Sequence, residues 1–131
     1  MFAGSRPKNL GARAGKLAPC PNKPNCVSSQ ADTTDSHYIP PIALSGSANE
    51  AVARIKKIIL TMPRTQVVNE APNYLYVEFT SKLMGYVDDV EFYVDENVKR
   101  IHVRSASRLG YRDFNVNRNR IEAIRTQFNA S

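Results

Sequence analysis

Residues 89–105 read DVEFYVDENVKRIHVRS, and this stretch predicts the centre of the fold. Apolar and polar residues alternate over residues 89–95 and again over residues 100–105, which is typical of strands that bury one face. Residues 96–99 lie between the two strands and are expected to form a turn. The stretch therefore predicts an antiparallel hairpin.

A turn at residues 96–99 also predicts which residues of the hairpin face one another. In this register Glu91 lies opposite Arg104, and Tyr93 lies opposite His102. Both pairs belong to the polar side of the alternation, so we expect them on the outward face of the sheet.

The chain before the hairpin predicts two more strands and a helix. Residues 74–80 alternate in the same way, and residues 65–69 form a shorter strand. Ser47 and Glu50 have the S-x-x-E spacing of a capping box, directly before apolar residues that recur at helical spacing. Pro63 disfavours helical geometry at the residue before it, so the helix should end there.

A second helix is expected after the hairpin, from about residue 115 to residue 129, with an apolar stripe along one side. Asn117 falls on this stripe, where a buried amide must be hydrogen-bonded; alternatively, Asn117 is the N-cap and lies outside the helix. Together these elements predict an α+β, two-layer fold, with an antiparallel sheet of about four strands packed by two helices.

Residues 1–46 differ in composition from the rest of the chain. They hold six of the eight prolines and four of the six glycines, which predicts an extended, irregular N-terminal segment. We expect this segment to pack on an α+β body formed by residues 47–131, with the whole chain making one domain.

Cys20 and Cys26 lie in the N-terminal segment. Their C-x5-C spacing matches no zinc or redox motif. A short disulfide loop is the simplest interpretation, and two unpaired buried thiols are the alternative. A disulfide would favour an oxidising compartment.

Composition narrows the class of protein. The chain has 131 residues, of which 42% are hydrophobic, enough for one domain with a real core. Its net charge of +6 is modest, and many soluble proteins carry as much without an anionic partner. The apolar runs, such as residues 58–60, are far shorter than the roughly 20 residues of a membrane span. No signal-peptide pattern follows Met1, so a cytosolic protein and a mature exported form are both open.

The densest polar stretch, residues 104–120, is the candidate binding site. It holds five arginines and joins the last strand to the last helix, where backbone amides and guanidinium groups favour an anion. The candidate side chains are Arg104, Ser105, Ser107, Arg108, Arg112, Asp113, Asn117 and Arg118. Alternatively, the arginines pair with nearby carboxylates. We expect such pairing for Arg104 and Arg108, and we expect Arg112 and Arg118 to stand free.

The sequence predicts no catalytic residue, cofactor or metal site. It has neither a G-x-S-x-G elbow nor an H-E-x-x-H motif, and His37 and His102 lie far apart along the chain. Tyr111 and Phe114 interleave with arginines, but no nucleic-acid-binding motif accompanies them, so nucleic acid is not the expected partner.

Three motifs of the chain occur in the order found in a known family. They are LAPCPNKPNCVSS at residues 17–29, GYVDDVEF at residues 85–92, and RSASRLGYRDF at residues 104–114 with NRNRI after it. This pattern resembles the family catalogued as domain of unknown function 1499, over roughly residues 10–128. The resemblance implies bacterial and plastid-type proteins, often made with an export or lipoprotein signal, and it implies no activity.

Two hypotheses about function fit these observations. The first is a non-enzymatic accessory or protein-binding module of the periplasm or thylakoid lumen, which uses the arginine-rich loop and the polar sheet face to contact a partner protein, including one at a membrane. The alternative is a small enzyme or anion-binding protein with its site in residues 104–120. A deep pocket lined by these side chains would favour the alternative, and a flat surface of paired arginines would favour the first.

Overall fold

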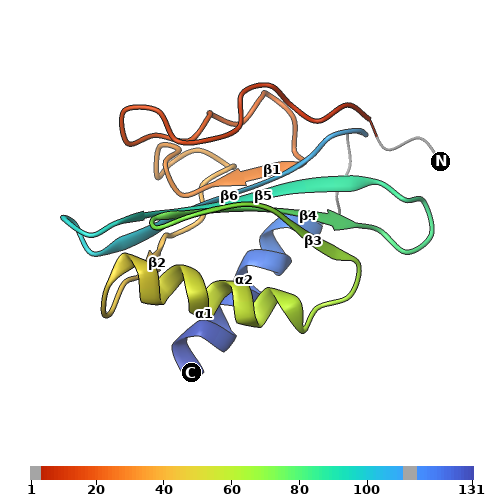
Figure 1. Cartoon of the computed structure of the whole chain (residues 1–131). Coiled ribbons are helices and arrows are strands. Elements are labelled where there is room, and N and C mark those ends of the chain that lie inside the picture. The colour runs from red at the N-terminus through yellow and green to blue at the C-terminus, as the bar shows by residue number, and fades with distance from the viewer. Residues whose placement is uncertain (1–3, 111–114) are drawn as a thin grey trace.

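The computed structural model describes residues 4–110 and 115–131, which form an α+β fold of six strands and two helices. The elements are β1 (Cys26–Ser28), β2 (Ile42–Ala43), α1 (Ala48–Leu60), β3 (Thr65–Ala71), β4 (Tyr74–Thr80), β5 (Val87–Asp95), β6 (Arg100–Ser107) and α2 (Val116–Ala130). Strands β3 to β6 form an open antiparallel meander, and β1 and β2 both pair with the outer edge of β6. Both helices cover one face of the sheet, and the first part of the N-terminal segment lies over the other (Figure 1).

The main hydrophobic core lies between the sheet and the two helices. The period-two alternation of the strands directs side chains such as Val77 and Phe92 to this face. Helix α1 contributes Ile55 and Ile59, and α2 contributes Phe128 from its apolar stripe. The two-layer arrangement that the sequence predicts is therefore present, with helices on only one face.

Helix α1 begins at the predicted capping box. The Ser47 hydroxyl accepts a hydrogen bond from the backbone N–H of Glu50, and the Glu50 carboxylate accepts one from the backbone N–H of Ser47. These bonds satisfy two backbone donors that have no partner within the helix.

Replacing Ser47 with alanine is expected to lower the free energy of unfolding by about 1 kcal/mol, because it removes one side of this cap. Urea denaturation checks the value. Ser45→Ala is the control, since Ser45 lies before the cap, and an equal loss in both variants would contradict the capping role.

The predicted hairpin of β5 and β6 is confirmed. Glu91 pairs with Arg104 and Tyr93 pairs with His102, as the turn at residues 96–99 requires. All four side chains lie on the face away from the main core, but the expectation that this face is open to solvent is wrong for Glu91 and Arg104, whereas Tyr93 and His102 are partly exposed. Glu91 is fully buried and Arg104 is 5% exposed, because the N-terminal segment covers their face of the sheet.

The N-terminal segment also adds two strands that the sequence did not predict. Strand β1 pairs with residues 104–106 of β6, and β2 pairs with residues 100–101, so the sheet has six strands rather than about four. Each is only two or three residues long. Such short strands carry no alternation that a sequence pattern can reveal.

Candidate functional site

A buried layer of charged side chains lies beneath the first part of the N-terminal segment, residues 4–21, which we call the strap. At its centre Arg108 donates from Nε and Nη2 to the carboxylate of Asp89, at 3.0 and 2.9 Å. Nη2 also donates to Glu78, at 2.6 Å. The hydrogen bonds from Arg108 to Asp89 are the main reason why its pKa is raised above the ordinary arginine value. Arg108 is thus a structural cation that holds two strands together, as expected.

Residues of the strap add further ion pairs and hydrogen bonds to this network. Arg6 pairs with Glu78 at 2.7 Å, and the carbonyl of Gly4 accepts a hydrogen bond from Arg108. Further along, the backbone N–H of Gly11 donates to Glu91. The strap is therefore anchored to the sheet through the charges of β4, β5 and β6.

Arg104 is buried like Arg108 but is far less well partnered. Its Nη2 donates to the carbonyl of Pro19 at 3.3 Å, and its Nη1 lies 3.9 Å from Oε1 of Glu91. Within residues 4–110 and 115–131, its Nε and that Glu91 oxygen have no hydrogen-bond partner. Burial lowers the pKa of Arg104, and the neighbouring carboxylates only partly oppose this effect.

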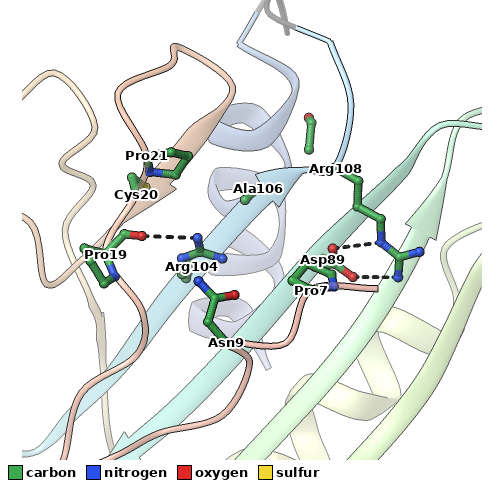
Figure 2. Close-up of a pocket in the computed structure, with 10 residues that line it drawn as sticks. Pro7, Asn9, Pro19, Cys20, Pro21, Asp89, Arg104, Ala106 and Arg108 are labelled. Atoms are coloured by element: carbon green, nitrogen blue, oxygen red, sulfur yellow. Dashed lines mark hydrogen bonds and ion pairs between the residues drawn. The ribbon is translucent and has the colours of Figure 1, made fainter. Parts of the chain in front are cut away.

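Arg104 lines a cavity of about 330 Å³ between the strap and the sheet, which we call the strap cavity. Figure 2 shows Arg104 at its centre, with the carbonyl of Pro19 on one side and the Asp89–Arg108 pair on the other. The lining residues are Pro7, Asn9, Pro19, Cys20, Pro21, Asp89, Arg104, Ala106, Ser107 and Arg108. The cavity thus has a charged floor on the sheet and a proline-rich wall on the strap.

The Cys20–Cys26 disulfide closes one wall of the strap cavity and is confirmed by the structure. Cys26 belongs to β1, which pairs with β6 beside Arg104, whereas Cys20 follows directly after Pro19. The bond therefore ties the strap carbonyl that contacts Arg104 to the edge of the sheet.

The purified protein is expected to be lighter by two hydrogen atoms than its reduced form in mass spectrometry without reductant. The double variant Cys20→Ser/Cys26→Ser should lose about 2 kcal/mol of unfolding free energy, because the unfolded chain loses its small closed loop. Two thiols that alkylate freely in the native protein would contradict the pairing.

The other part of the predicted site lies on the opposite face of the sheet, against α2. Asn117 is fully buried; its amide Nδ2 donates to the carbonyl of Asn25 at 3.1 Å, and its Oδ1 accepts from the hydroxyl of Ser105 at 2.6 Å. The helical alternative for Asn117 is therefore the observed one. Arg120 joins this group by donating to Asn117 and to Asp88.

The structure distributes the predicted site residues over both faces of the sheet. Arg104 and Arg108 lie on the strap face. Ser107, at the end of β6, lines the strap cavity, and its hydroxyl also accepts a hydrogen bond from Nδ2 of Asn117 at 3.0 Å. Ser105 and Asn117 lie on the helix face. These residues therefore do not form one site.

The remaining candidate residues are Arg118, Arg112 and Asp113. Arg118 was expected to stand free, but its guanidinium donates to the carbonyls of Tyr38 and Ser36, at 2.8 and 2.9 Å. It therefore fastens α2 to the N-terminal segment. Arg112 and Asp113 lie outside the described residues.

Sequence reasoning missed the residues that the strap contributes. Asn9 and Pro19 lie more than 80 residues before Arg104 in the chain, and they line the same cavity. The only signal that pointed to them was the apolar and proline-rich composition of the N-terminal segment, which indicated packing but not the partner surface.

Two kinds of feature are absent from the described residues, a metal-ion cluster and a membrane-spanning helix. No group of three or more His, Cys, Asp and Glu side chains placed to hold a metal ion occurs in residues 4–110 and 115–131. In the same part of the chain, neither helix is long and apolar enough to span a membrane.

Comparison with models of known protein families gives a match. The model of a family described as "Protein of unknown function (DUF1499)" matches residues 16–128, nearly the whole chain. No curated protein matches the sequence.

Proposed function

The chain belongs to the family of proteins of unknown function DUF1499, and we propose that it is a non-enzymatic binding protein that holds a small anion in the strap cavity, beside Arg104. The observation that carries this proposal is the buried and incompletely partnered guanidinium of Arg104. The first hypothesis from the sequence used the arginine-rich loop and the polar sheet face as a protein contact. The strap buries Glu91 and Arg104 on that face and encloses a cavity beside Arg104, so the anion-binding alternative has the better support.

Unfilled hydrogen-bond donors, rather than net charge, indicate why the ligand is an anion, since the carboxylate of Glu91 already offsets the charge of Arg104. Arg6 and Arg108 are paired with Glu78 and Asp89 at 2.6–3.0 Å, whereas Arg104 has only a carboxylate at 3.9 Å and one long hydrogen bond. A guanidinium has five N–H donors, and a buried charge with unfilled donors is costly. A small anion in the cavity would fill donors of Arg104 and reduce this cost.

The lining of the cavity favours holding a ligand over converting it. Both oxygens of Asp89 accept hydrogen bonds from Arg108, and Cys20 is oxidised in the disulfide. Neither side chain is therefore placed to act as a base or a nucleophile. The proposal accordingly assigns binding alone.

We also propose that the protein is located in an oxidising compartment, the periplasm or the thylakoid lumen. The disulfide supports it, since cystines persist in such compartments and are rare in the reducing cytosol. The redox state of Cys20 in cells, trapped by alkylation at harvest, tests this part. Recovery of the native protein with both thiols reduced would count against it.

Thermal unfolding in acetate and in phosphate, with sodium chloride at matched ionic strength as reference, tests the anion site. An anion at about ten times its dissociation constant should stabilise the protein by about 1.4 kcal/mol, seen as a rise of several degrees in melting temperature. Arg104→Gln should abolish this rise. Arg100→Gln, on the same strand but exposed, is the matched control and should retain it.

A second variant keeps the test valid if Arg104→Gln folds poorly. Ala106→Leu leaves every charge in place and fills part of the strap cavity, because Ala106 lines it. It should also lose the stabilisation by the anion. An equal rise in the wild type and in both cavity variants, or no rise with either anion, would refute the proposed function.

A further inference from the structure

The turn between β4 and β5 exposes three large hydrophobic side chains within four residues. Leu83 is 86% exposed, Met84 is 57% exposed and Tyr86 is 40% exposed. Single exposed apolar residues are common on soluble proteins, but a cluster of this kind at one point marks an interaction surface. We call residues 81–86 the apolar turn.

The apolar turn is a projecting and well-defined feature. Figure 1 shows it extending beyond the helices at one end of the sheet, on the right of the view. Two hydrogen bonds close its base: the N–H of Ser81 donates to the carbonyl of Tyr86, and the N–H of Tyr86 donates to the hydroxyl of Ser81. Leu83 and Met84 are therefore held at a convex tip.

Positive charge flanks the tip. A groove of about 430 Å³ beside it is lined by Arg64, Lys82 and Arg120, with Asp88 as the one carboxylate among the described lining residues. Asp88 is occupied by Arg120 at 2.8 Å. Neither Arg64 nor Lys82 forms an ion pair with any residue that the structure describes, so two cations remain for an external anionic partner.

We propose that the apolar turn docks the protein on the surface of an anionic lipid bilayer. A convex tip suits insertion between lipid headgroups, whereas docking on a protein would need a partner with a complementary concave groove. Leu83 and Met84 would enter the boundary of the acyl chains, and Arg64 and Lys82 would lie at the level of the phosphates. This surface is separate from the strap cavity, so the inference does not depend on the proposed anion ligand.

Tryptophan fluorescence gives a direct test, because the chain contains no tryptophan. In the variant Leu83→Trp, the emission should shift to shorter wavelength on addition of vesicles of phosphatidylcholine and phosphatidylglycerol in a 3:2 ratio. Vesicles of phosphatidylcholine alone should give a much smaller shift. Val98→Trp places the probe in the turn at the opposite end of the sheet, where Val98 is 51% exposed, and should show no shift.

Co-sedimentation with the same vesicles tests the wild-type protein. The variant Leu83→Ser/Met84→Ser should lose vesicle binding, and Lys82→Gln should weaken it about fivefold, as expected for one cation near an anionic surface. Val98→Ser is the matched control and should bind as the wild type does. All four proteins should melt normally, since none of these side chains is buried.

Three results would overturn the inference. The first is failure of the wild type to sediment with anionic vesicles. The second is equal sedimentation of the wild type and Leu83→Ser/Met84→Ser. The third is a concentration-dependent dimer in analytical ultracentrifugation that the double variant abolishes, which would assign the apolar turn to a second copy of the chain instead.

Discussion

Replacing Arg108 with alanine is expected to lower the free energy of unfolding by about 3–5 kcal/mol, the cost of removing one partner of a buried ion pair. The side chain of Arg108 is 8% exposed, and its guanidinium pairs with both Asp89 and Glu78, although Glu78 also pairs with Arg6. Without it, the carboxylate of Asp89 stays buried beneath the strap with only the hydroxyl of Tyr76 as a remaining donor among the described residues.

Urea unfolding of Arg108→Ala and of Arg100→Ala measures this effect. Arg100 is the control because it lies on the same sheet and is exposed. The loss should exceed that of Arg100→Ala by at least 2 kcal/mol, given a value near zero for an ordinary surface substitution. A loss of the same small size in both variants would show that Arg108 is not the structural cation of the strap face.

The second large effect is expected at Asn117. Alanine at this position should lower the free energy of unfolding by about 2–4 kcal/mol, because it leaves more than one buried polar group without its partner. Asn117 joins three parts of the chain: the carbonyl of Asn25 in the N-terminal segment, the hydroxyl of Ser105 in β6, and Arg120 in its own helix.

Asn119→Ala is the matched control, since Asn119 lies in the same helix and is exposed. It should change stability little, because alanine is the better helix former. Hydrogen exchange adds a second readout. In Asn117→Ala the amide of Ser107, which donates to the carbonyl of Asn25, should exchange faster. Similar melting temperatures for the two variants would contradict the linking role of Asn117.

The hairpin and the first helix could be predicted because their signals are local. The register of β5 and β6 follows from alternation and one turn, and the start of α1 follows from the spacing of Ser47 and Glu50. Both depend only on neighbouring residues, which a sequence pattern records directly.

The covered polar face could not be predicted from the same alternation. A polar residue on a strand indicates the solvent side, yet Glu91 and Arg104 are buried there because the strap supplies the N–H of Gly11 and the carbonyl of Pro19. These partners are backbone groups more than 75 residues away in the chain, and backbone groups leave no trace in the sequence.

The candidate site could be predicted only in part, because the sequence indicates its arginines but not their contacts in the folded protein. Arg104 and Arg108 stand out in a dense polar stretch, and alternation assigns both to the same face of the strand. Their different roles were not predictable, because Arg108 is placed between two carboxylates and Arg104 is not. The two arginines differ by about one ångström in the distance to their nearest carboxylates, and only the folded structure sets these distances.

The central claim is that Arg104 holds an anion, and the ¹⁵N–¹H resonance of its Nε–H group reports on this most directly. The group is buried, so its proton should exchange slowly enough to be observed, and Arg104→Lys identifies the signal by its loss. On titration with acetate or phosphate, we predict a saturable shift of the Arg104 resonance, while the Nε–H of Arg108, already bonded to Asp89, stays nearly unchanged. An Arg104 resonance that does not move, or that moves no more than that of Arg108 at anion concentrations matched in ionic strength, would contradict the account.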